Sequence, residues 1–112
     1  MIENYSFGEI KIDGKTYRSD VIIYKDRVDD NWWREAGHSL SLKDIAGILN
    51  LKPEVLIIGT GESGCLSVPQ KIKEEIEAKG IKVVIKRTEE ACEEYNKTYK
   101  NRDVIAALHL TC

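Results

Sequence analysis

A glycine-rich string after an apolar run is the clearest sign of a binding site in this sequence. It reads Gly59-Thr60-Gly61-Glu62-Ser63-Gly64 and fits the pattern G-x-G-x-x-G. Glycines in such a bend let main-chain N–H groups approach an anion, so a small anion, a nucleotide phosphate or a partner's carboxylate is the ligand class it suggests. The alternative is that the glycines only permit positive φ in a tight bend over a sheet.

The surroundings of this string do not favour a dinucleotide cofactor. A pyrophosphate site needs the helix to begin within the motif, whereas Ser67 and Gln70 predict a capping box and a helix start near residue 67. Lys86-Arg87 stands where an acidic residue would bind the ribose hydroxyl. Arg87 suits a phosphate instead. We therefore expect no cofactor and keep Arg87 with the bend as a candidate small-anion site.

A thiol and an imidazole are candidates for a nucleophile and its base. Cys65 lies in the bend, and His109 would act as its base if the last strand lies alongside. Burial as a small hydrophobic residue is the commoner fate of cysteine, and we expect it for Cys65 and Cys92. Together with Cys112 they have neither zinc-site nor disulfide-framework spacing. A small-ligand or redox enzyme is therefore the second hypothesis.

Two adjacent tryptophans form a second candidate contact surface. Trp32-Trp33-Arg34 follows a run of charged and amide residues. Tryptophan and arginine are residue types that anchor protein interfaces. Because adjacent residues of an extended segment point to opposite sides, we expect one tryptophan to cover the sheet and the other to be exposed or in a contact. His38 is expected to be a hydrogen-bonded loop residue.

Length and composition limit the classes of protein to consider. The chain has 112 residues, 42% of them hydrophobic, and 17 basic against 19 acidic side chains, a net charge of −2. This predicts one domain, residues 1–112, with a real core. Charges are spread along the length, so neither nucleic acid nor a membrane is an expected partner. The opening residues show no signal or transit pattern, and we expect a cytoplasmic protein with reduced thiols.

Apolar patterning predicts the elements that hold these residues. Asp13-Gly14 between alternating segments predicts a β-hairpin with a type I′ turn. Helices are predicted to begin at the capping residues Ser41, Ser67 and Thr88, the second ending at Gly80. Strands are predicted at 21–24, 55–59, 82–86 and 104–110, with a loop or edge hairpin over 25–38. Strand and helix alternate after residue 51, which indicates crossovers in a largely parallel sheet.

Helical spacing also predicts which faces pack inward. In the first helix these residues are Leu42, Ile45, Ala46 and Leu49. In the second they are Val68, Ile72 and Ile76, with Pro69 in the first turn. In the third they are Ala91, Tyr95 and Tyr99.

Three of these segments together resemble a known family. They are the bend with its proline-started helix (58–61 to 68–69), the segment Thr88-Glu89-x-Ala91-x-x-x-Tyr95-Asn96 and the ending Leu108-His109-Leu110-Thr111-Cys112. The combination resembles the adipogenesis-associated Mth domain family, which includes a mitochondrial assembly factor for respiratory complex I. The resemblance implies a three-layer α/β fold: a central mixed five-stranded sheet, one strand antiparallel, with flanking helices and an N-terminal β-hairpin extension.

The family has no established catalytic activity, and its better-understood eukaryotic members look like partner-binding or assembly proteins, so the same resemblance implies partner binding or assembly. A mitochondrial role is not carried over, because no targeting segment precedes Tyr5. Our first hypothesis is a non-enzymatic binding module, an assembly or adaptor factor with an unidentified protein partner. A homodimer through an edge strand and a small anion at the bend are the other expected forms of binding. The candidate contact residues are Gly59, Thr60, Gly61, Ser63, Gly64, Cys65, Arg87, Trp32, Trp33, Arg34 and His38.

Overall fold

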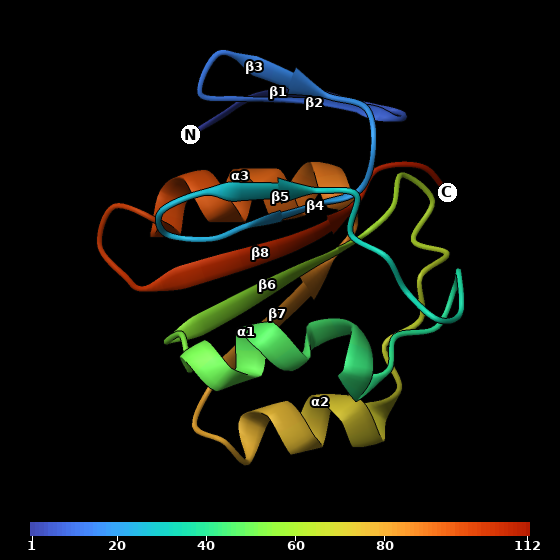
Figure 1. Cartoon of the computed structure of the whole chain (residues 1–112), viewed down its shortest axis with the longest axis vertical. Coiled ribbons are helices and arrows are strands. Elements are labelled where there is room, and N and C mark those ends of the chain that lie inside the picture. Colours follow the sequence, from blue (N-terminus) through green and yellow to red (C-terminus); the bar gives the residue numbers. More distant parts are fainter.

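A mixed five-stranded sheet is the middle layer of the computed structural model, which describes all of residues 1–112 (Figure 1). Its strands are β4 (Val21–Ile23), β5 (Val28–Asp30), β6 (Val55–Thr60), β7 (Lys82–Lys86) and β8 (Val104–His109). Their order is β5-β4-β8-β6-β7, and β8 pairs parallel with β6 but antiparallel with β4.

This arrangement confirms the mixed sheet that the resemblance implied and corrects the largely parallel sheet inferred from the alternation of elements. Helical crossovers make only β6, β7 and β8 parallel to one another. The strands β4 and β5 are joined by a tight turn and are therefore antiparallel. The middle strand is β8, and β6 is the buried interior strand beside it.

The N-terminal extension is a second sheet of three strands, β1 (Ile2–Ser6), β2 (Glu9–Ile12) and β3 (Lys15–Tyr17). Between β2 and β3, Asp13 and Gly14 have φ of 47° and 85°, which confirms the predicted type I′ hairpin. The first strand, β1, was not predicted separately. It is joined to the third helix because Asn96 accepts a hydrogen bond from the Ile2 N–H and donates one to the Ile2 carbonyl.

Helices cover both faces of the central sheet. A 3₁₀ turn (Leu42–Ile45) leads into α1 (Ala46–Leu51), which lies with α2 (Gln70–Glu77) on one face, while α3 (Thr88–Thr98) lies on the other, under the N-terminal sheet (Figure 1). No helix has the length and apolar character that crossing a bilayer requires.

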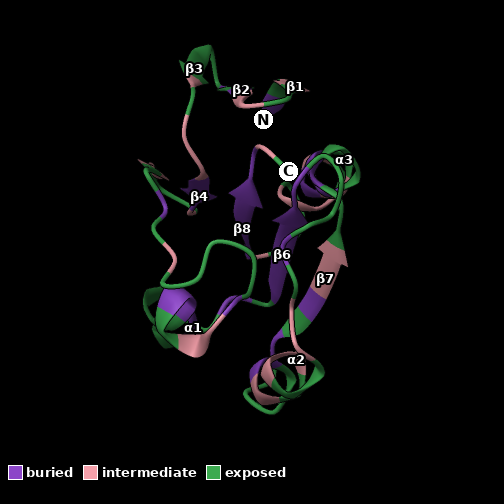
Figure 2. Cartoon of the chain, turned by 90° about the vertical axis from the view of Figure 1, so that its right-hand side faces the viewer, coloured by how far each residue is buried: buried purple, intermediate pink, exposed green.

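Two apolar clusters, one on each face of the sheet, form the core. The residues of β6 and β8 are buried throughout (Figure 2), and alternate residues contribute to opposite clusters. On the α3 face, Ala91 and Tyr95 are buried and Tyr99 packs partly against the cluster, which confirms the predicted inner face of that helix. On the other face, Ile76 is buried with Val68 and Ile72 partly so, again as predicted.

The first two helices depart from their predicted details. In the first, Ala46 is exposed and Ile48 is buried, because the opening 3₁₀ turn shifts the helical phase. The second begins at Gln70 instead of near Ser67, and Pro69 is its N-cap. Ser67 lies outside the helix because it forms an isolated parallel β-bridge with Ser39. The predicted stop at Gly80 is confirmed by its φ of 83°.

Candidate functional site

The glycine-rich bend after β6 is filled by another part of the same chain. The Glu62 N–H donates to the Thr111 carbonyl at 2.7 Å. The N–H groups of Ser63 and Cys65 both donate to the main-chain oxygen of Cys112, at 3.3 and 3.0 Å. Residues 111–112 therefore lie where the sequence analysis expected a small anion or a partner's carboxylate.

The remaining donors of the bend are also occupied. Gly61 N–H donates to the Thr88 hydroxyl oxygen at 2.8 Å, and those of Gly64 and Leu66 donate to the carbonyls of Gly61 and Thr60. Every N–H from residue 61 to residue 66 thus has an acceptor within the protein. An anion would have to displace residues 111–112 to be bound by main-chain donors here.

Two glycines of the bend allow close approach between chain segments. Gly61 has a φ of 103°, and a Cβ atom there would lie 2.4 Å from the main-chain carbon of Cys112 and 2.8 Å from Cδ2 of His109. A Cβ atom on Gly59 would lie 2.8 Å from the Leu108 side chain and 2.9 Å from Oγ1 of Thr88. These glycines bring β6 against α3 and against residues 109–112.

Thr88 joins these segments and is not the helix cap that its position predicted. Arg87 is the N-cap of α3. The buried Thr88 hydroxyl accepts the hydrogen bond from Gly61 and donates one to the His109 carbonyl. A hydroxyl that both donates and accepts is satisfied in the core, so its role is to fasten the end of β8 to the bend.

A buried charge cluster lies at the same end of β8. Oδ2 of Asp20 is 2.9 Å from Nη1 of Arg34 and 2.8 Å from Nδ1 of His109, and Oδ1 accepts the Leu110 N–H at 2.7 Å. The side chains of Arg34 and His109 are each 7% exposed and that of Asp20 is 16% exposed. One carboxylate therefore holds a loop arginine and two residues at the end of β8.

Nδ1 of His109 lies within hydrogen-bond distance of two groups, 2.8 Å from Oδ2 of Asp20 and 3.1 Å from Nη2 of Arg34. Nε2 is buried with no hydrogen-bond partner. The ring of His38 meets His109 edge to face, with centroids 6.3 Å apart. His38 is exposed in the loop and its carbonyl accepts the Ser67 N–H at 2.8 Å, so it is a hydrogen-bonded loop residue as expected.

Asp20 is ionised in this cluster. Burial by itself would raise the pKa of Asp20, but hydrogen bonds from His109, the Leu110 N–H and Arg34 outweigh it and hold the pKa below its ordinary value. The carboxylate therefore compensates the buried Arg34 guanidinium, which would otherwise lack a counter-charge.

The cluster positions the loop that carries the two tryptophans. Trp32 is buried, and its indole N–H donates to the Asp44 carbonyl at 2.9 Å. Cζ of Arg34 lies over its ring, 4.7 Å from the ring centroid. Asp44 also accepts N–H bonds from Glu35 and Ser41. Between these fixed residues, Trp33 is 74% exposed. The prediction that one tryptophan is buried and its neighbour exposed is confirmed.

The predicted burial is correct for one cysteine, Cys92, and wrong for another, Cys65. Cys92 is buried, which confirms its predicted packing role, and this burial raises the pKa of its thiol to about 12. Cys65 is exposed, so its predicted burial is wrong, because the bend turns it away from the core. Cys65 and His109 form no hydrogen-bonded pair, since Nδ1 of His109 faces Asp20 and Nε2 has no partner.

The structure brings the two predicted surfaces to one end of the sheet. The bend and Arg87 lie together, because a Cβ atom on Gly64 would lie 3.4 Å from Cγ of Arg87. Arg87 itself is exposed and faces Glu90. The loop 32–38 reaches the same end through Arg34 and His109.

Asp20 was missed from sequence. The signal lay in the antiparallel strand that the resemblance implied: pairing of Val21 with Leu108 places Asp20 beside His109 and Leu110. A parallel sheet offers no such neighbour.

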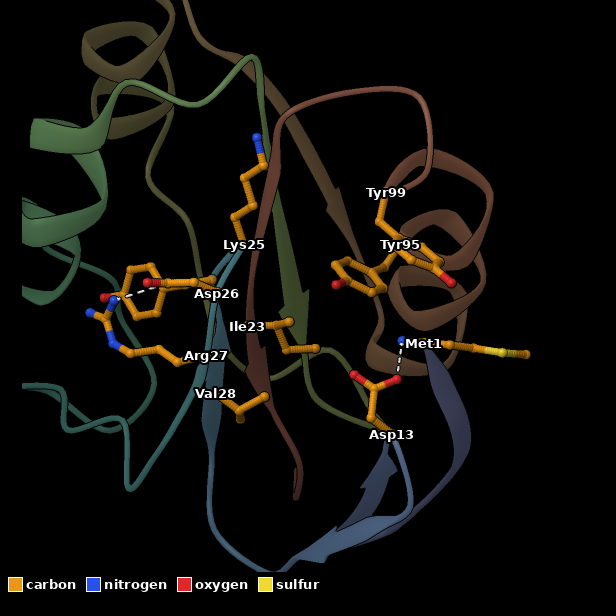
Figure 3. Close-up of a pocket in the computed structure, with 10 residues that line it drawn as sticks. Met1, Asp13, Ile23, Lys25, Asp26, Arg27, Val28, Tyr95 and Tyr99 are labelled. Atoms are coloured by element: carbon orange, nitrogen blue, oxygen red, sulfur yellow. Dashed lines mark hydrogen bonds and ion pairs between the residues drawn. The ribbon is translucent and has the colours of Figure 1, made fainter.

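A surface pocket lies at the other end of the sheet, about 290 Å³ in volume (Figure 3). Tyr95 and Tyr99 stack on its α3 side, with ring centroids 5.1 Å apart. The turn from Lys25 to Arg27 forms another side (Figure 3). None of the residues that line it belongs to the bend or the charge cluster.

The central mixed sheet, its helices on both faces and the small N-terminal sheet define a three-layer α/β domain. A family model described as "Protein of unknown function (DUF498/DUF598)" matches residues 2–109. The chain therefore belongs to the DUF498/DUF598 family.

Solved structures agree with this assignment. The chain is similar to a conserved hypothetical protein, PH1505, from Pyrococcus horikoshii OT3, with 30% identity over 100% of this chain and 99% of that one and a TM-score of 0.89. It is also similar to MT938, with 27% identity, coverage of 100% and 98% and a TM-score of 0.82. A Mth938-like domain protein from Bordetella pertussis shares the fold at 22% identity, with coverage of 97% and 84% and a TM-score of 0.73.

Proposed function

We propose that this domain is a protein-binding module of the assembly or adaptor type, which contacts its partner through Trp33 and the adjoining residues of the loop 31–39. One observation carries the proposal: Trp33 is 74% exposed on a loop whose neighbouring side chains are buried. A large aromatic side chain held in place before binding loses little conformational freedom on contact and is a frequent hot spot.

The contacts under the loop support this proposal. Trp32 and Arg34, on either side of Trp33, have side chains fixed by Asp44 and by the Asp20–His109 pair. Buried ion pairs contribute little net stability, because both charges lose their water. The ion pair between Asp20 and Arg34 sets the position of the loop 31–39. That loop exposes the indole ring of Trp33.

The occupied bend weighs against the enzyme alternative. A phosphate or an oxyanion needs free donors, and the N–H groups of residues 61–66 are bonded within the protein. The exposed Cys65 forms no hydrogen bond with His109, the base expected to activate it. Binding at the loop requires none of these groups to be free.

Quantitative affinity capture from a native lysate tests the proposal, with the wild type, Trp33→Ala and Leu51→Ala as baits. Leu51 is the matched control: it is 57% exposed but lies at the end of α1, away from the loop. We expect at least one protein to be recovered equally by the wild type and Leu51→Ala and to be depleted about tenfold with Trp33→Ala. Equal recovery of all proteins by the three baits would contradict the proposal.

A further inference from the structure

Two exposed thiols lie on the two segments that meet in the bend. Cys65 and Cys112 are both free and exposed, whereas Cys92 is buried. The Cys65 N–H donates to the main-chain oxygen of Cys112 at 3.0 Å, and the Ser63 N–H donates to the same oxygen at 3.3 Å. Gly61 also packs closely against the main chain of Cys112 and so helps to hold Cys112 beside the bend.

This hydrogen bond limits how far apart the two cysteines can be. With an N···O distance of 3.0 Å and standard bond lengths, the two Cα atoms are at most about 7 Å apart. Disulfides usually join residues whose Cα atoms are about 4.4 to 6.8 Å apart. The separation of the two main chains therefore falls within, or at the edge of, the range that a disulfide spans.

We infer that Cys65 and Cys112 form a reversible intramolecular disulfide that clamps residues 111–112 onto the bend. The oxidant is a low-molecular-weight disulfide, RSSR. One protein thiol loses its proton and its thiolate attacks a sulfur of RSSR, breaking the S–S bond and releasing RS⁻, which takes up that proton. The second thiolate attacks the mixed disulfide and releases the other RS⁻, so two protein thiols are oxidised while RSSR is reduced to two RSH.

The disulfide would control access to the donors of the bend. In the dithiol form, hydrogen bonds and packing alone hold residues 111–112 over the N–H groups of Glu62, Ser63 and Cys65. In the disulfide form this segment cannot leave, and the donors stay covered. Cys92 takes no part, because its burial raises the pKa of its thiol to about 12 and keeps it unreactive.

Incubation of the full chain with oxidised glutathione, followed by intact-mass and peptide mass spectrometry, tests the inference. We expect the wild type to lose two hydrogen atoms without retaining glutathione, and its peptides to show a Cys65–Cys112 link. The melting temperature should rise on the order of 10 °C, because the link closes a long loop in the unfolded chain. Cys92→Ala should behave like the wild type, while Cys65→Ser and Cys112→Ser should each keep one glutathione on the remaining exposed thiol.

Two results would overturn the inference. One is wild-type protein that carries glutathione on Cys65 and Cys112 separately, which would show that the thiols do not reach each other. The other is a link that forms only between two molecules, seen as a covalent dimer. Dithiothreitol should restore the starting mass and melting temperature, and failure to do so would exclude a reversible disulfide.

Discussion

The two ends of the central sheet use polar residues in opposite ways. At the end where β8 begins, a pocket of about 290 Å³ is open and the nearby Arg27–Asp26 ion pair is exposed, with side-chain exposures of 53% and 77%. At the end where β8 finishes, the Asp20, Arg34 and His109 side chains are at most 16% exposed and the bend is filled by residues 111–112.

This difference shows that the surface pocket and the cluster of buried charged side chains lie at opposite ends of the sheet. A site for transforming a small molecule needs both in one place. The buried charges instead reach into the loop beside them, where Arg34 is next to the exposed Trp33. Variants that break the contacts at each end separately measure how much each set of polar residues contributes to the free energy of unfolding.

The largest difference is expected for the carboxylates of the two ends. Asp20→Asn removes the counter-charge of a buried guanidinium and should lower the free energy of unfolding by about 3–5 kcal/mol. Asp26→Asn breaks an exposed pair and should cost less than about 1 kcal/mol. Urea denaturation of both variants checks this, and similar losses would contradict the assigned contrast.

The second largest difference is expected between the stability losses caused by Gly61→Ala and Gly80→Ala, at the two ends of the sheet. Gly61→Ala must adopt a φ of 103° and would bring Cβ within 2.4 Å of Cys112, so we expect a loss of about 3 kcal/mol. Gly80→Ala meets a similar φ of 83° with no atom within 4 Å and should cost only about 1 kcal/mol. Thermal denaturation gives both losses. Faster hydrogen exchange of the Glu62 amide in Gly61→Ala alone would show that residues 111–112 have left the bend.

A smaller, pH-dependent effect sharpens the comparison. Because the pKa of Asp20 is lowered in the folded state from an ordinary value of 3.8, its ionised form adds stability above that value. This stability is lost as the pH falls through the folded pKa. The stability gap between the wild type and Asp20→Asn should therefore be full at pH 7 and narrow below about pH 4. A gap of constant size in urea titrations at both pH values would refute this role of the carboxylate.

Local patterns predicted much of this fold, because their physics is local. Asp13-Gly14 specifies its own turn, the apolar run before Gly59 is a buried strand, and adjacent Trp32 and Trp33 must point to opposite sides. The strand order was not readable in this way, since β4 meets β8 through pairing between distant parts of the chain.

The site depended on those distant pairings. Asp20 gains its partners only when β4 and β8 are antiparallel. Cys65 is exposed and the bend is filled because residues 111–112 return to it. Thr88 looked like a helix cap because its sequence context is that of one, but its hydroxyl is taken by Gly61 and His109. Each of these errors came from assigning a local role to a residue whose partner is far along the chain.

The affinity of a captured partner for three purified proteins tests the central claim most directly: that the fixed loop presents Trp33 for binding. Isothermal titration calorimetry with the wild type, Trp33→Ala and Leu51→Ala gives the three dissociation constants. We predict that Trp33→Ala weakens binding more than about tenfold, or about 1.4 kcal/mol, with an unchanged melting temperature, while Leu51→Ala binds as the wild type does. Equal affinity of Trp33→Ala and the wild type would contradict the account.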